Sequence, residues 1–182
     1  FKRLSQIAVL TGAAHIFTLF VLKFLSKNTS AATLTSIGEI DSTFQLLISI
    51  LGFGLQLSAV RHIAIEQKWK IFYYQAQRAR IALGLMITSV ALFALIYPSC
   101  WLFIFAPVFA LSGDYALYGR GQPVKAAIWA FCRTFIPSLL LIVFVFINKK
   151  YLSAAYIMST VAVFGITGFA ISRQLHCKYF IS

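Results

Sequence analysis

The sequence predicts an all-α membrane protein, a polytopic helical bundle of six transmembrane helices. Hydrophobic residues make up 60% of the 182 residues, only 11% are charged, and Lys and Arg outnumber Asp and Glu by 16 to 4. Soluble domains carry about 45–50% apolar and about 25% charged residues, so this composition excludes a water-solvated globule. The many Phe, Leu and Ile residues exclude disorder. The basic residues lie between long apolar runs and not along one face, so we expect no nucleic acid partner.

The first two expected spans cover Ile7–Leu25 and Ile37–Val60, each long enough for a hydrocarbon core that takes about 20 helical residues. The first run is longer than the apolar region of a signal peptide, and no small-residue cleavage site follows it. Before the second, Ser36 and Glu39 have the spacing of a capping box. Glu39 and Asp41 are therefore interpreted as acids at a helix start near the outer interface.

The third and fourth expected spans cover Ala79–Tyr97 and Cys100–Tyr118, with Pro98 between them. The third has the shortest uninterrupted apolar run, which begins just after Arg78 and Arg80. The connector before it mixes Trp, Phe and Tyr with Lys and Gln. That mixture favours an amphipathic segment at the cytoplasmic interface or a cytosolic extension of the third helix. Its aromatic and basic residues are interpreted as an interface belt, not as a dedicated lipid site.

The fifth and sixth expected spans cover Val124–Ile147 and Tyr151–Ser172, and the polar residues 148–150 separate them. Because helices satisfy their own backbone groups in lipid, the apolar length of each run is sufficient to assign it as a helix. We treat residues 1–182 as a single transmembrane lobe. Glycines within the runs are interpreted as points of close packing or bending.

The distribution of positive charge predicts which side of the membrane each connector faces. Cytoplasmic segments carry an excess of Lys and Arg. With the N-terminus inside, the cytoplasmic segments hold eleven basic residues, which are Lys2, Arg3, Arg61, Lys68, Lys70, Arg78, Arg80, Arg120, Lys125, Arg173 and Lys178. The outer segments hold four, which are Lys23, Lys27, Lys149 and Lys150. We therefore expect both termini of this chain in the cytoplasm.

Arg133 is the basic residue that remains after the two sides are counted, and it lies inside the fifth expected span, eight residues past Lys125. At a rise of 1.5 Å per residue this is about 12 Å along the helix, too deep for easy snorkelling. Asp114 lies near the cytoplasmic end of the fourth span, about 6 Å from Arg133 in depth by the same rise. Two alternatives remain open: a buried Asp114–Arg133 pair that joins two helices, or a cavity wall whose cation binds an anionic substrate.

Two further side chains are candidates for the same cavity. His15 lies near the middle of the first span, where it would relay protons, bind phosphate, or form a hydrogen bond to another helix. Arg61 ends the second span on the cytoplasmic side, as an anchor or as a contact for a lipid phosphate. No motif for a metal, a phosphate-binding loop or a catalytic triad is present, and we expect no cofactor and no metal.

Two short segments resemble a known family of transporters. Residues 51–64 (LGFGLQLSAVRHIA) resemble the end of the second helix in bacterial polysaccharide flippases, where a glycine-containing turn leads to a small residue and an Arg. Residues 117–126 (LYGRGQPVKA) resemble the loop between the fourth and fifth helices of the same proteins. These are the O-antigen and other lipid-linked oligosaccharide flippases, of the multidrug/oligosaccharidyl-lipid/polysaccharide exporter superfamily.

The resemblance implies an inner-membrane protein that moves an undecaprenyl-diphosphate-linked oligosaccharide between leaflets for surface polysaccharide synthesis. It implies two lobes of about six helices around a cationic cavity that alternates access, with membrane lipid and the polysaccharide polymerase machinery as partners. On this basis the chain is expected to be the N-terminal lobe of a longer flippase. The cavity residues would be Arg133, Asp114, His15 and Arg61, of which Arg61 alone matches a family motif.

Other functions stay open at this point. A small-solute or multidrug exporter of the same superfamily would have an acidic or apolar cavity, so Arg133 favours an anionic substrate instead. An intramembrane enzyme acting on polyprenyl phosphates would require a polar catalytic cluster that the sequence does not contain. A membrane scaffold would not need a buried Arg133. We therefore expect a transporter and not an enzyme.

Overall fold

The computed structural model describes residues 2–52, 54–93 and 98–175, and these are helical apart from short turns, with no strand among them. The prediction of an all-α helical protein is confirmed. Residues 94–97, which end the expected third span, and Lys178 lie outside the described residues. In chain order the helices are α1 (Lys2–Asn28), α2 (Ala31–Gly52), α3 (Leu55–Ile65), α4 (Trp69–Phe93), the 3₁₀ helix η1 (Pro98–Phe105), α5 (Ala106–Ala110), α6 (Asp114–Gly119), α7 (Pro123–Ile147), the 3₁₀ helix η2 (Lys149–Tyr151) and α8 (Leu152–Gln174).

The length and composition of the helices are those of a membrane protein. Among the described residues, four helical segments are long and apolar enough to cross a bilayer, and α2 with α3 makes a fifth if the bent pair is one span. The four are Leu4–Asn28, Cys100–Gly119, Pro123–Ile147 and Lys149–Gln174. Large apolar side chains such as Ile16, Val143 and Phe169 are exposed along these helices, as expected for surfaces that contact acyl chains. The number of six spans stays a prediction.

The start of the second helix differs from the expected one. α2 begins at Ala31, and the Ser30 hydroxyl accepts a hydrogen bond from the backbone N–H of Thr33 at 3.2 Å. Ser30 is therefore the residue that caps the helix. The capping box expected at Ser36 and Glu39 is wrong because both residues lie inside the helix, in its second and third turns.

The expected second span is also broken near its middle. α2 ends at Gly52 and α3 begins at Leu55, and the two helices meet at 47°. Gly54 precedes α3 with φ of 67°, a left-handed conformation that glycine adopts without a steric cost. The sequence predicts one continuous helix over Ile37–Val60, whereas the structure has two helices and a break.

The expected fourth span is divided into three shorter pieces: η1, α5 and α6. Pro107 lies in the first turn of α5, so it offers no N–H to the carbonyl of Phe103 four residues earlier. A second break separates α5, which ends at Ala110, from α6, which begins at Asp114. The apolar run from Cys100 to Tyr118 was sufficient to predict a span, but not its interruptions.

The connector before the third expected span is helical. α3 continues to Ile65, and α4 begins at Trp69 and runs without a break to Phe93. The third helix therefore begins ten residues before the expected span, and whether this part lies at the interface or in the cytosol stays a prediction. α4 carries Lys70, Arg78 and Arg80 and is not among the segments apolar enough to count as a span.

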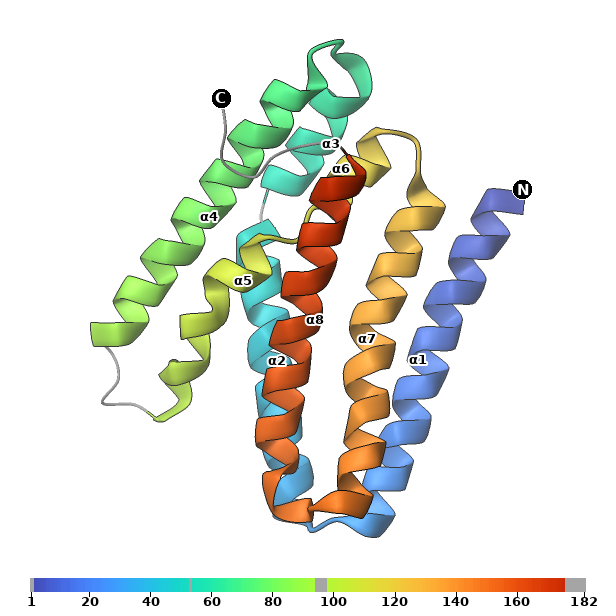
Figure 1. Cartoon of the computed structure of the whole chain (residues 1–182), viewed down its shortest axis with the longest axis vertical. Helices are drawn as coiled ribbons and strands as arrows, with labels where there is room; N and C mark the ends of the chain where they lie inside the picture. Colours follow the sequence, from blue (N-terminus) through green and yellow to red (C-terminus); the bar gives the residue numbers. More distant parts are fainter. Residues whose placement is uncertain (1, 53, 94–97, 176–182) are drawn as a thin grey trace. The chain divides into compact units, whose positions relative to one another are not determined.

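By its contacts the chain divides into two compact units. Unit 1 comprises residues 1–42 and 123–163, and unit 2 comprises residues 43–122 and 164–182. In unit 1, α1 packs along α7 (Figure 1). Its apolar core contains Val21, Leu25, Ile37, Leu141, Val145 and Leu152.

Unit 2 is built around the continuous helix α4. This helix packs against α3, η1 and α5, and α3 packs against α6 (Figure 1). Phe109 of α5 lies between Phe44 and Phe164, with ring centroids at 4.9 and 4.5 Å. Unit 1 therefore consists of long helices, whereas unit 2 contains the α2–α3 break and the α5–α6 break.

Candidate functional site

Arg133 is buried within α7, in unit 1. Its side chain is only 8% exposed, and it shares the buried side of α7 with Pro137 and Ser138. Next to it in sequence, Thr134 is exposed, so the burial of Arg133 reflects the face of the helix on which it lies. The expectation that Arg133 faces a bundle interior or a wet cavity stays a prediction.

Pro137 weakens α7 at the position of Arg133. A proline has no N–H, and it clashes with the carbonyl group four residues earlier in the helix. That carbonyl belongs to Arg133. Arg133 is therefore both a buried cation and the residue whose carbonyl lacks its helical hydrogen bond. This carbonyl is a polar backbone group at the base of the same side chain.

Aromatic side chains surround the neighbouring turns of α7 in unit 1. Phe135 lies with its ring centroid 4.4 Å from that of Phe17 on α1 and 5.1 Å from that of Phe131. These contacts hold α1 against α7 through apolar surface. Arg133 is therefore carried by a helix whose other contacts in this unit are predominantly aromatic and aliphatic.

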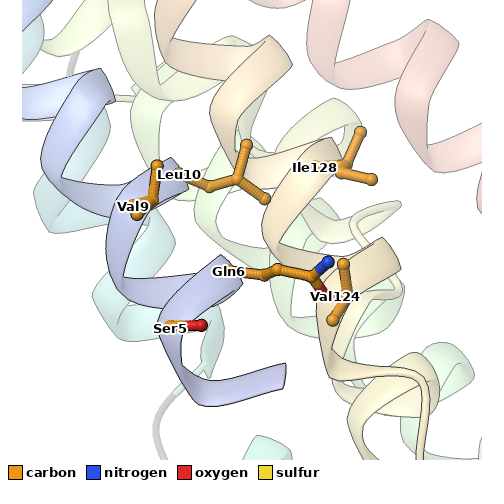
Figure 2. A pocket seen from close by; sticks show the side chains of 6 residues that line it. All are labelled: Ser5, Gln6, Val9, Leu10, Val124 and Ile128. Carbon is orange, nitrogen blue, oxygen red and sulfur yellow. The ribbon is translucent and has the colours of Figure 1, made fainter. Parts of the chain in front are cut away.

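A shallow groove lies between the first turns of α1 and α7 (Figure 2). It is lined by Ser5, Gln6, Val9, Leu10, Val124 and Ile128. In Figure 2 the amide of Gln6 reaches across from α1 toward Val124. The lining is mainly aliphatic, and the groove does not include any of the four predicted site residues.

The other predicted residue of unit 1, His15, is exposed on α1. A polar link that the sequence analysis did not anticipate joins α2 to α8 in the same unit. The Tyr156 hydroxyl donates to the Asp41 carboxylate at 2.6 Å, and Ser36 lies 3.2 Å from Ser153 between hydroxyl oxygens. Asp41 therefore connects two helices, and it lies in the interior of α2 and not at a helix start as expected.

Asp114 and Arg61, the two predicted site residues of unit 2, have different surroundings. Asp114 is the first residue of α6, where its negative charge is favourable at a helix N-terminus, and it is half-buried. Arg61 is exposed on α3. Because Arg133 belongs to unit 1 and Asp114 to unit 2, the expected pair between them stays a prediction.

Unit 2 contains a buried polar cluster that the sequence analysis missed. Tyr73, Gln77 and Arg80 lie on one face of α4 and are 1%, 2% and 1% exposed. The Gln77 amide donates to the Ala110 carbonyl at 2.8 Å, and its oxygen lies 3.0 Å from the Tyr115 hydroxyl. A buried polar network of this kind is stabilising only when its members have partners.

Arg80 is the centre of this cluster. Its Nε donates to the Leu51 carbonyl at 3.2 Å, one terminal nitrogen donates to the Ser112 carbonyl, and the other donates to the Ser112 hydroxyl at 2.8 Å. The guanidinium carbon lies 5.4 Å from the centre of the Tyr115 ring. These contacts use the planar, multi-donor shape of the guanidinium group, which a lysine does not have.

From the sequence Arg80 is predicted only as part of a cytoplasmic flank, although a signal for its burial is present. Tyr73, Gln77 and Arg80 have the spacing of residues i, i+4 and i+7, which places them on one face of a helix. Their acceptors lie 29 to 33 residues away in sequence, at Leu51, Ala110 and Ser112. The face could be predicted, but not what it contacts.

Comparisons with known proteins do not assign the chain to a family. No family model, no curated protein and no solved structure matches it. Within the residues that the structure describes, no group of three or more His, Cys, Asp or Glu side chains could hold a metal ion.

Proposed function

We propose that this chain forms part of a transporter that flips an undecaprenyl-diphosphate-linked oligosaccharide across the bacterial inner membrane. The substrate would serve surface polysaccharide synthesis, such as that of O-antigen. Both termini of the chain would lie in the cytoplasm, as the charge distribution predicts. The resemblance of residues 51–64 and 117–126 to lipid-linked oligosaccharide flippases supports the same substrate class.

The observation that carries the proposal is the burial of Arg133 in a strongly apolar helix. A charged side chain deep in a membrane helix is costly, and it is characteristic of substrate pathways. Arg133 is 8% exposed in α7, which is otherwise composed almost wholly of apolar residues. A diphosphate is an anion whose oxygens accept the paired hydrogen bonds that a guanidinium donates.

The proposed mechanism requires the cation to become accessible to substrate during the transport cycle. Pro137 would provide a flexible point in α7 next to Arg133 because the helix lacks one hydrogen bond there. A change of bend at this point would move the guanidinium relative to the rest of the helix. Alternating access would then expose the bound diphosphate first to one leaflet and then to the other.

The test is to replace Arg133 in the native host and to measure surface polysaccharide together with the amount of protein in the membrane. Arg133→Ala should reduce export at least tenfold, and Arg133→Lys should retain part of it because the charge is kept. Lys125→Ala is the matched control, since Lys125 is an exposed cation of the same helix. Unchanged export by Arg133→Ala at normal protein level would exclude this role.

A further inference from the structure

Two helix breaks in unit 2 leave backbone carbonyl groups without helical partners. In a continuous helix the Leu51 carbonyl would accept from residue 55 and the Ser112 carbonyl from residue 116. α2 instead ends at Gly52, and the N–H of Ala116 donates to Gly113. Carbonyl groups at helix ends need other donors, and lipid provides none.

One face of α4 supplies donors to both breaks. Arg80 donates to Leu51 at the first break and to Ser112 at the second. Gln77, one turn earlier, donates to Ala110 at the end of α5. The same guanidinium group therefore donates to one carbonyl of α2 and to one carbonyl of the segment between α5 and α6.

α4 is held close to the segment that it supports. A Cβ added at Gly84 would lie 3.1 Å from the Pro107 Cα and 3.2 Å from the Ala106 carbonyl carbon, closer than nearly all real contacts. Thr88, one turn further, has its hydroxyl 3.4 Å from the Phe103 carbonyl, whose helical donor Pro107 removes. α4 thus follows the interrupted chain over several turns, and Arg80 occupies a fixed place on it.

We propose that Arg80 couples the two helix breaks, so that the α2–α3 break and the α5–α6 break open or rearrange together. A movement at either break that withdraws its carbonyl leaves a buried guanidinium with fewer partners, which is costly. The cost is avoided when both segments move together with the guanidinium and keep both carbonyl contacts. This coupling does not depend on which substrate the protein carries.

Hydrogen–deuterium exchange on the full-length protein in lipid nanodiscs tests the coupling. Two peptides report the breaks, one covering residues 49–56 and the other 109–116. Arg80→Gln should raise exchange roughly tenfold or more in both peptides, since each loses a charged donor. Arg78→Gln is the matched control because Arg78 is an exposed cation of the same helix, and it should change neither peptide.

Ser112→Ala is the second variant, and it tests coupling without removing the buried charge. It deletes the hydroxyl that accepts from Arg80 at 2.8 Å but keeps both carbonyl contacts. Faster exchange in the 49–56 peptide as well as in 109–116 is the expected result. A change confined to 109–116 would overturn the proposal, as would an Arg80→Gln variant that loosens one break only. Ser112→Ala also decides the question if Arg80→Gln does not accumulate.

Discussion

The two units solve the same physical problem, a polar group inside apolar surroundings, in different ways. Unit 1 is made of long helices without a break, and its buried cation, Arg133, lies on α7, where Pro137 removes a single backbone hydrogen bond. Unit 2 contains interrupted helices, and its buried cation, Arg80, donates to carbonyls that the breaks expose. Burial alone therefore does not assign a role to an arginine, and the proposal for Arg133 rests on its burial in a strongly apolar helix, which α4 is not.

The polarity of α4 explains this difference. α4 is too polar to count among the membrane-crossing segments, and its buried polar residues are the ones that bond the breaks. A broken helix is tolerated in a membrane only where neighbouring protein satisfies its backbone. The polarity of α4 and the interruptions beside it are thus parts of one arrangement.

The largest expected effect is the loss of stability on replacing Arg80. Arg80→Leu leaves the carbonyls of Leu51 and Ser112 without this donor, and each buried acceptor left unsatisfied costs about 1–3 kcal/mol. The free energy of unfolding in detergent micelles measures the change. Arg78→Leu, two residues away and exposed, should change it by less than about 0.5 kcal/mol. Equal losses in the two variants would contradict the role given to Arg80.

A steric change in each unit sharpens the comparison. Gly84→Ala in unit 2 forces a Cβ to within 3.1 Å of the Pro107 backbone and should cost about 1–3 kcal/mol. Gly12→Ala in α1 of unit 1 meets nothing within 4 Å and should stabilise the helix by about 1 kcal/mol. Thermal unfolding of both variants gives the comparison, and destabilisation by Gly12→Ala would show that α1 has unseen close neighbours.

The polar link between Asp41 and Tyr156 in unit 1 should contribute less to the free energy of unfolding than the network around Arg80 in unit 2. Tyr156→Phe removes the hydroxyl that donates to Asp41 at 2.6 Å, and a hydrogen bond to a charged group contributes about 1.5–3 kcal/mol. Because Asp41 is half-buried, the lower end of that range is expected. Tyr151→Phe, at an exposed tyrosine, is the control for denaturation measurements. No difference between the two variants would mean that this link does not stabilise unit 1.

The smallest expected effect concerns the start of α2. Ser30→Ala removes the hydroxyl that accepts from the Thr33 N–H and should cost about 1 kcal/mol. Circular dichroism during urea unfolding measures the loss. An effect below about 0.3 kcal/mol would indicate that the helix does not depend on this cap.

Much of the helical architecture could be predicted from apolar run length, because the length of a run requires only that each residue be apolar. The expected spans Ile7–Leu25, Val124–Ile147 and Tyr151–Ser172 each fall within or largely within one helix of the structure. The breaks could not be predicted in this way, because the hydropathy of a run does not depend on whether its backbone carbonyls accept helical hydrogen bonds. Gly54 was a signal of the α2–α3 break and Pro107 of the boundary between η1 and α5, and both lie inside runs that were interpreted as continuous.

The two buried arginines differ in the same way in how far they could be predicted from the sequence. The burial of Arg133 followed from its depth in an apolar run, a property of local sequence. The role of Arg80 depends on acceptors about 30 residues away, at Leu51 and Ser112, and on breaks that local sequence did not indicate. The face formed by Tyr73, Gln77 and Arg80 was visible as a helical spacing, but its partners required the fold.

The central claim is that Arg133 serves a substrate whereas Arg80 serves the backbone. The most direct measurement compares Arg133→Gln with Arg80→Gln in the native host, with surface polysaccharide exported per amount of membrane-inserted protein as the readout. We expect Arg133→Gln to lower this ratio at least tenfold at a near-normal protein level. We expect Arg80→Gln to lower mainly the amount of membrane-inserted protein. A normal ratio for Arg133→Gln, or a loss of export that only follows its protein level, would contradict the claim.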